Sequence, residues 1–180
     1  MGRLYDRFYP AVHRYCWRRL FDRTAAEDVA SEVFLQVAAN MHRFAGSTSD
    51  DFRCWVFRIA TNAVNAHQRQ RSRRDALLSR AFRLGWWNRS GEPEPEASIE
   101  GEVLGQDWAK VEEAFRTLGP REQTAVSLRH MEGLSFDQVA KIMGEREGTL
   151  RVVVSRALQR LRDKLTVPPD GTAARGGRCS

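Results

Sequence analysis

The side chains with the clearest chemical potential lie near the C-terminal end, on one side of a predicted helix over 148–165. At 100° per residue, Leu150, Val154 and Leu158 lie on the inward side of this helix, and Arg156 points away from them. A short predicted helix and a glycine-containing turn come first, which is the helix-turn-helix pattern. Guanidinium groups on such an outward face can contact phosphates or base edges in the DNA major groove. Because any amphipathic helix has an outward face, the indication of DNA binding rests on the whole three-helix arrangement.

A second basic cluster occupies 67–74, at the end of a long predicted helix that starts near Asp51. Its arginines, Arg69, Arg71 and Arg73 among them, can neutralise several phosphates, although cations at a helix end also simply offset the helix dipole. Aromatic residues flank the loop that precedes this helix. Base stacking on aromatic rings is typical of single-stranded nucleic-acid sites, and aromatic residues at helical spacing are also typical of a core. Both interpretations stay open at this point.

The predicted helix over 24–41 has an acidic side within a basic N-terminal half. Its apolar stripe includes Val29 and Val33, which leaves the other side free. A solvated face is the ordinary interpretation, but a leucine exposed among acids also suits docking of a basic partner helix. The residues on this side are Asp28, Ser31, Glu32, Leu35 and Gln36.

Catalysis and metal binding find little support. His13 and Cys16 lie one helical turn apart, which is a ligand spacing, but the remaining histidines and cysteines form no paired Cys-x-x-Cys pattern. No phosphate-cradling loop and no nucleophile motif is present in the sequence. We therefore expect no metal, no cofactor, no small-molecule substrate and no enzymatic activity. Three cysteines at scattered positions do not form a disulfide framework and suit a reducing cytoplasm.

The elements that must position these groups are helices. Both basic stretches have helical periodicity without strand alternation, so an all-α fold is predicted. The chain of 180 residues has 29 basic and 23 acidic side chains, a net charge of +6 and a pI near 9.8, which favours a polyanionic partner, nucleic acid before membrane. Its apolar runs are far shorter than the roughly 20 residues of a membrane span, so we expect a cytoplasmic protein that is not membrane-embedded.

Two small helical domains joined by a flexible acidic linker are predicted. The alternation of proline and glutamate at 92–96 keeps a chain extended and solvated. The expected organisation is a first domain at 1–75, a linker at 76–107, a helix-turn-helix domain at 108–166 and a disordered tail at 167–180. Trp86 and Trp87 either anchor a partner or fold back onto the first domain, and the role of Cys179 is open.

With both basic stretches described, the chain resembles a bacterial RNA polymerase sigma factor of the extracytoplasmic function (ECF) type. The resemblance to region 2 of that family lies at 4–10, 26–35 and 52–62, and includes Ala26-Glu27-Asp28-Val29-Ala30. The resemblance to region 4 lies at 118–123, 132–140, 148–150 and 156–162, and includes Glu132-Gly133-Leu134-Ser135. A helix-turn-helix alone is common, whereas the two regions in this order are specific.

The resemblance implies a subunit that gives RNA polymerase its promoter specificity. Region 2 would dock on core polymerase through Asp28, Ser31, Glu32, Leu35 and Gln36. It would recognise and melt the −10 element through Phe44, Ser47, Arg53, Asn62, Asn65, Arg69, Arg71 and Arg73. Region 4 would bind the −35 element through Thr149, Arg151, Val152, Ser155, Arg156 and Arg160.

The partners implied by the resemblance are core RNA polymerase, promoter DNA and an anti-sigma factor. The rival hypothesis is a helix-turn-helix regulator that binds duplex DNA without polymerase. That hypothesis explains the C-terminal half and leaves the acidic side of the N-terminal half unused.

Overall fold

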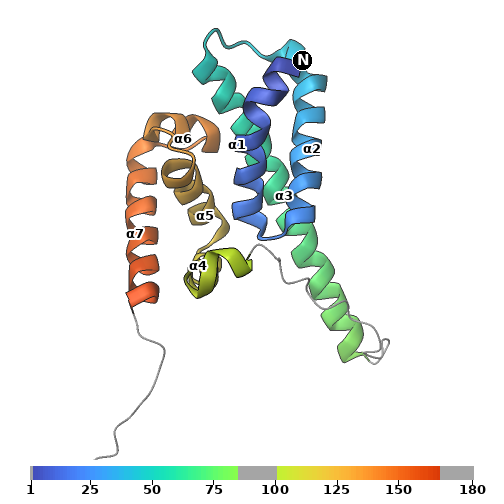
Figure 1. The fold of residues 1–180 in the computed structure, drawn as a ribbon, viewed down its shortest axis with the longest axis vertical. Coiled ribbons are helices and arrows are strands. Elements are labelled where there is room, and N and C mark those ends of the chain that lie inside the picture. Colours follow the sequence, from blue (N-terminus) through green and yellow to red (C-terminus); the bar gives the residue numbers. More distant parts are fainter. Residues whose placement is uncertain (1, 85–100, 167–180) are drawn as a thin grey trace, which may run out of the picture.

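The computed structural model describes residues 2–84 and 101–166, and within these ranges the chain folds into helices connected by short loops (Figure 1). The prediction of an all-α fold is confirmed. The helices in chain order are α1 (Gly2–Leu20), α2 (Arg23–Asn40), the 3₁₀ turn η1 (Met41–Arg43), α3 (Ser49–Arg83), α4 (Gly101–Arg116), α5 (Pro120–Val126), the π-helical turn η2 (Ser127–Met131), α6 (Phe136–Met143) and α7 (Glu147–Thr166).

The first three helices form a bundle that we call the N-terminal unit (Figure 1). Each helix contributes a fully buried valine to the space between them: Val12 in α1, Val33 in α2 and Val56 in α3. The start of α2 is fixed by Asp22, whose carboxylate accepts a 2.9 Å hydrogen bond from the backbone N–H of Ala25. Such a cap satisfies a backbone donor that the first helical turn leaves unpaired.

Helix α3 is longer than the sequence predicted. It continues to Arg83, past the expected end of the first domain at 75, because residues 76–83 are rich in alanine, leucine and arginine, which favour a helix. Helix α4 likewise begins at Gly101, inside the expected linker. The rest of that linker and the expected tail, with Trp86, Trp87 and Cys179, lie outside the described residues.

Helices α4–α7 form the C-terminal unit, in which α6, a tight turn and α7 make the predicted helix-turn-helix. The Ser135 hydroxyl and the Gln138 side chain cap α6 reciprocally, as the sequence pattern predicts. Gly144 ends α6 with φ +68°, a left-handed conformation that glycine adopts without steric cost. The turn therefore sends the chain directly into α7.

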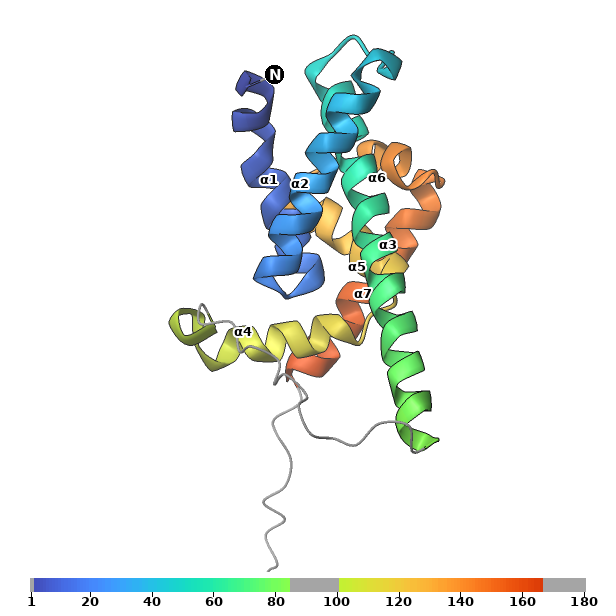
Figure 2. The ribbon, with the colours of Figure 1, turned by 90° about the vertical axis from the view of Figure 1, so that its right-hand side faces the viewer.

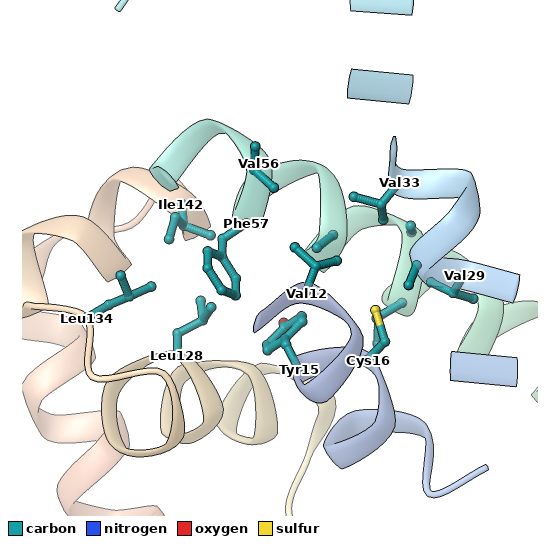
Figure 3. Close-up of a cluster of buried hydrophobic side chains, with 14 of the residues drawn as sticks. Val12, Tyr15, Cys16, Val29, Val33, Val56, Phe57, Leu128, Leu134 and Ile142 are labelled. Carbon is teal, nitrogen blue, oxygen red and sulfur yellow. The ribbon is translucent and has the colours of Figure 1, made fainter. Parts of the chain in front are cut away.

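The two units share one hydrophobic core. Figure 3 shows Phe57 of α3 pointing toward Leu128 and Ile142 of the C-terminal unit, and both it and Tyr15 of α1 are fully buried. The rings of Tyr15 and Phe57 meet edge to face at 5.6 Å. The Tyr15 hydroxyl is 3.0 Å from the hydroxyl of Thr61, so the polar end of this buried ring has a partner. The units are thus joined by packing like that of a single-domain interior.

A smaller apolar cluster joins the units just beyond the C-terminal end of α1. Phe21, in the turn after α1, packs edge to face on Phe115 of α4 with 5.9 Å between ring centroids. The guanidinium of Arg116 lies 5.1 Å from the centroid of the Phe21 ring. Figure 2 shows α4 running crosswise to α3, near the end of α7. Contacts from the C-terminal half of α1 and from the turn that follows it therefore hold the C-terminal unit against the bundle.

We expect Phe57→Ala to lower the free energy of unfolding by about 3–5 kcal/mol, because it removes a fully buried ring from the shared core. Urea denaturation followed by circular dichroism measures this loss. Leu77→Ala is the matched control, since Leu77 is 67% exposed on the far part of α3, and should change stability by less than about 0.5 kcal/mol. A loss below about 1 kcal/mol for Phe57→Ala would contradict the shared core.

Candidate nucleic-acid and protein interfaces

The predicted docking face of α2 is exposed. Asp28, Ser31 and Glu32 are exposed, and Leu35 retains 72% of its accessible surface. The opposite side of α2 is buried against α1 and α3, and this packing fixes the docking face toward solvent. The Gln36 amide donates a 2.9 Å hydrogen bond to the Glu32 carboxylate, which holds two of the polar side chains in place. The structure brings all the predicted docking residues together on one surface.

An apolar groove of about 490 Å³ adjoins this face, between α1 and α2. Leu4 and Tyr5 of α1 form one wall, and Phe34 and Leu35 of α2 line the other part. Tyr5 stacks on Tyr9 with 4.7 Å between centroids and meets Phe34 at 4.9 Å. The sequence prediction missed Leu4 and Tyr5. The sequence did contain a sign of this wall, because Leu4 and Tyr5 are adjacent large apolar residues in the first turns of α1. They precede the part of the helix that is buried in the bundle.

The loop at 44–48 is tied to the start of α3. Thr48 and Asp51 cap α3 reciprocally: the Thr48 N–H donates to the Asp51 carboxylate at 3.1 Å, and the Asp51 N–H donates to the Thr48 hydroxyl at 3.0 Å. The hydrogen bonds from Thr48, joined by the Ser47 N–H, hold the pKa of Asp51 below its usual value. The carboxylate therefore stays ionised at neutral pH and holds the backbone of Ser47 and Thr48 against the start of α3.

Phe44 lies over an aromatic shelf at the base of this loop. Its ring centroid is 5.3 Å from those of Phe52 and Trp55. A Cβ atom on Gly46 would come within 2.5 Å of the Phe44 ring and 2.6 Å of the Asp51 Cβ, closer than such atoms pack. Glycine at this position therefore allows the loop to pass close to the ring, with Ser47 exposed beside it.

The remaining predicted −10 residues separate into groups along α3. Asn62, Asn65, Arg69 and Arg73 line a cleft of about 720 Å³, whose other wall is formed by α5 and the end of α6. Arg71 instead lies on another side, 3.9 Å from the Asp22 carboxylate. The loop with Phe44 and Ser47 precedes α3, so these groups are distributed over much of the length of that helix rather than gathered in one pocket.

Arg53 faces the C-terminal unit. Its guanidinium donates a 2.7 Å hydrogen bond to the backbone carbonyl of Glu132 and covers the Phe57 ring at 5.8 Å. Arg53 is thus engaged by the chain itself in this arrangement. The sequence carried no signal for this contact, because the two residues are 79 positions apart and no local pattern specifies which distant carbonyl an arginine meets.

Arg19 is a buried cation that the sequence prediction also missed. It is 1% exposed, and its guanidinium donates to neutral oxygens from both units. The acceptors are the side chains of Asn65, Gln68, Gln123 and Thr124 and the carbonyl of Pro120. A buried charge is costly unless hydrogen bonds satisfy it. Opening of the cleft would therefore release both this charge and the Asn65 amide that it holds.

The predicted −35 residues share the exposed face of α7. Thr149, Val152, Ser155 and Arg156 are exposed, while Leu150 is fully buried on the opposite side. The flanking arginines are held by neighbours, because Arg151 pairs with Glu147 and lies 4.6 Å over the Phe136 ring. Arg160 pairs with Glu122. The structure therefore brings the predicted residues together and distinguishes Arg156 from the two anchored arginines.

No metal site is found where the structure describes the chain: no three candidate ligand side chains gather among residues 2–84 and 101–166. Cys16 is fully buried, and burial raises the pKa of its thiol to about 12, so it stays protonated at neutral pH. In the same residues no helix has the length and apolar character needed to cross a membrane.

Comparison with known proteins matches both units. Residues 4–74 match the family model Sigma-70 region 2, and residues 108–161 match Sigma-70, region 4. The ECF RNA polymerase sigma factor BldN of Streptomyces coelicolor is 34% identical over 165 residues, which are 89% of this chain and 58% of that protein. The RNA polymerase sigma-H factor of Pseudomonas aeruginosa is 30% identical over 157 residues, which are 84% of this chain and 78% of that protein.

The fold agrees with these matches. The sigma factor RpoE of Bartonella quintana, solved with the anti-sigma factor NepR, superimposes with a TM-score of 0.68 at 24% identity, over 93% of this chain and 98% of that one. This chain spans about three fifths of the length of BldN and of SigE from Mycolicibacterium smegmatis. With both regions matched in order and a relative at 30% identity covered over most of its length, the chain belongs to the bacterial RNA polymerase sigma factors of the ECF type.

Proposed function

We propose that this chain binds core RNA polymerase and directs promoter-specific transcription initiation. The observation that carries this proposal is the pair of exposed faces on one chain: an acidic and apolar face on α2 and a basic and polar face on the recognition helix α7. A protein that only bound duplex DNA would need the second face alone. The chain would act in the cytoplasm as a non-enzymatic factor, with the expected domain division separating docking and melting from −35 recognition.

The α2 face supports docking on a basic helical surface of polymerase. Asp28 and Glu32 supply charge, and Leu35 beside the apolar groove supplies a contact that loses water on binding. The groove offers a place for an apolar side chain of the partner next to the acidic residues. This combination fits an amphipathic helix better than a flat charged surface.

An anti-sigma factor is the proposed regulator. Bartonella RpoE was solved with the anti-sigma factor NepR, and CnrH was solved with the cytosolic domain of CnrY. Those proteins share the fold of this chain, which supports an anti-sigma partner for it as well. Such a partner would block polymerase docking if it covered the α2 face, because the two would compete for the same surface.

The proposal is tested by transcription in vitro. Purified chain and core polymerase are incubated with the DNA upstream of the chain's own gene, and specific transcripts are mapped. Initiation that requires both components supports the proposal. A chain that binds the same DNA tightly without polymerase and never directs initiation would instead fit the helix-turn-helix regulator.

Charge reversal on α2 should weaken docking. We expect Asp28→Lys with Glu32→Lys to bind core polymerase about tenfold or more weakly, because like charges brought together at an interface cost several kcal/mol. Fluorescence anisotropy of labelled chain titrated with core polymerase gives the affinity. The control is Asp137→Lys with Asp163→Lys, which makes the same charge change on exposed residues of the C-terminal unit. Equal affinities for the two double variants would refute the docking face.

Gly46→Ala should impair promoter melting while docking is retained. The added methyl forces Phe44 or the start of α3 to move, and a displaced base contact costs about 1–3 kcal/mol. We expect permanganate reactivity of the −10 bubble to fall roughly fivefold or more. Ala45→Ser, at the exposed neighbouring position, should leave it unchanged. Normal melting by Gly46→Ala would assign the loop a different role.

Arg156 and Arg160 should differ in the kind of DNA contact they make. Arg156 is exposed near the centre of the α7 face, whereas Arg160 is held by Glu122. Arg156→Ala should cost roughly 1–3 kcal/mol at one −35 position, and Arg160→Ala should weaken all sequences and lower the salt slope by about 1. Because the units share a core, the assay uses the full chain with core polymerase on single-base −35 variants at two salt concentrations. A uniform loss for Arg156→Ala would show that Arg156 only contacts phosphate.

A further inference from the structure

Four arginines of the N-terminal unit point at oxygen atoms of the C-terminal unit, and we call them the arginine face: Arg14 and Arg18 of α1, and Arg53 and Arg58 of α3. Arg14 and Arg18 lie 3.3 Å and 3.4 Å from the two carboxylate oxygens of Glu132. Arg53 donates to the Glu132 carbonyl at 2.7 Å. Arg58 donates to the carbonyl of Lys141 at 2.6 Å. Each guanidinium is therefore bound to an acceptor across the contact between the units.

The acceptors share one electrostatic character. The carbonyls of Met131 and Glu132 lie at the C-terminal end of η2, and those of Lys141 and Ile142 lie in the last turn of α6. Carbonyls at a helix C-terminus lack an intrahelical partner and carry the negative end of the helix dipole. Together with the Glu132 carboxylate, they present a cluster of negative oxygens to the arginine face. Phosphate oxygens have the same character in a stronger form.

The charges across this contact are unequal. Four guanidinium groups meet a single carboxylate among the described residues, and that carboxylate is 1% exposed. Arg14 keeps 47% and Arg18 26% of the side-chain surface exposed, so solvent and ions reach the cations. A partner with several negative charges would neutralise the arginine face more completely than the C-terminal unit does.

The arginine face also continues into the proposed −10 surface. Arg58 precedes Asn62 by one helical turn on the same side of α3. Asn62, Asn65 and Arg69 line the cleft that begins there. A single DNA strand that runs along α3 would therefore reach Arg58 and then the arginines of α1 without leaving the surface of the N-terminal unit.

We propose that the arginine face is a phosphate-binding surface for promoter DNA, which the C-terminal unit covers in the closed chain with Glu132 and two helix ends in place of phosphates. The proposal rests on the proposed function and goes beyond it by assigning Arg14, Arg18 and Arg58 to DNA. It makes the closed arrangement and DNA binding mutually exclusive at this surface. Separation of the units would expose four arginines at once.

The test measures binding of the full chain, without polymerase, to a fluorescein-labelled single-stranded oligonucleotide of 20 nucleotides by anisotropy at several salt concentrations. Glu132→Gln removes the central charge of the contact without changing its shape. We expect about tenfold tighter binding, because apparent affinity rises with the fraction of open chain. We also expect the salt slope to steepen by up to about 3, since each phosphate neutralised on a single strand contributes about 0.7.

Two control variants separate this effect from a general change of charge. Glu113→Gln makes the same charge change in the C-terminal unit, where Glu113 is exposed on α4 and lies outside the cleft with Asn62 and Arg69. It should leave affinity and slope near those of the unaltered chain. Adding Arg14→Gln and Arg18→Gln to Glu132→Gln should lower the salt slope again by about 1.4, which is about 0.7 for each arginine removed.

Equal behaviour of Glu132→Gln and Glu113→Gln would overturn the proposal, as would a salt slope that the two arginine substitutions leave unchanged. Salt-resistant binding of a polyglutamate peptide with no gain in DNA binding would assign the face to an acidic protein and also overturn it. If thermal melting shows that Glu132→Gln does not fold, Arg14→Gln is tested in its place. The Arg14 side chain is half exposed, so this substitution should not unfold the chain. Bound to core polymerase on promoter DNA, this variant should have a salt slope lower by about 1, and an unchanged slope refutes the role of Arg14.

Transcription in vitro by the unaltered chain keeps this result separate from the proposed function. Specific initiation together with identical salt slopes for Glu132→Gln and Glu113→Gln refutes the arginine face and leaves the proposed function standing. Absence of initiation refutes the proposed function, whatever the oligonucleotide measurements show.

Discussion

The packing of the C-terminal unit against α1 and α3 is the constraint on which the rest of this arrangement depends. It buries Phe57 and Tyr15 together with Leu128 and Leu134, and burial of large apolar side chains is the main favourable contribution to such contacts. The same packing determines which polar groups lose solvent. Arg19, Glu132 and Gln123 are buried because the two units meet there.

Buried polar groups make this contact specific and also costly. Glu132 is satisfied by Arg14 and Arg18, whereas Arg19 receives only neutral acceptors and its Nε atom has no partner among the described residues. A buried charge without an opposite charge loses hydration that neutral hydrogen bonds restore only in part. The apolar core therefore favours the closed arrangement, while Arg19 opposes it. In the proposed function, such a balance would ease the release of the DNA-binding surfaces when the chain binds polymerase.

The proposed functional faces differ in how this contact affects them. The α2 face and the α7 face point away from it and are exposed. The side of α3 that carries Asn62, Asn65 and Arg69 lines the cleft between the units. Docking on polymerase would therefore require no rearrangement on the α2 side, whereas the Asn65 amide, which Arg19 holds, would become free only when the units separate. Order in initiation would follow from this geometry, with docking before melting.

Local patterns in the sequence were enough for the helices, the helix-turn-helix and the exposed faces. Hydrophobic periodicity determined which side of α2 and α7 is buried, because each amphipathic helix has one side that must leave water. The Ser135 cap and Gly144 defined α6 for local steric and hydrogen-bonding reasons. The extension of α3 to Arg83 was missed because the acidic segment further on suggested an earlier end.

The pairing of the two units was decided only by the tertiary structure. The contacts of Arg14, Arg18 and Arg53 with Glu132 join residues separated by 79 to 118 positions, and no local pattern encodes which carboxylate a distant arginine meets. Asn65 could likewise be predicted as a surface residue of α3, but not as a ligand of the buried Arg19. Periodicity reports which side of a helix leaves water, whereas the identity of the surface that covers it depends on the packing of the whole chain.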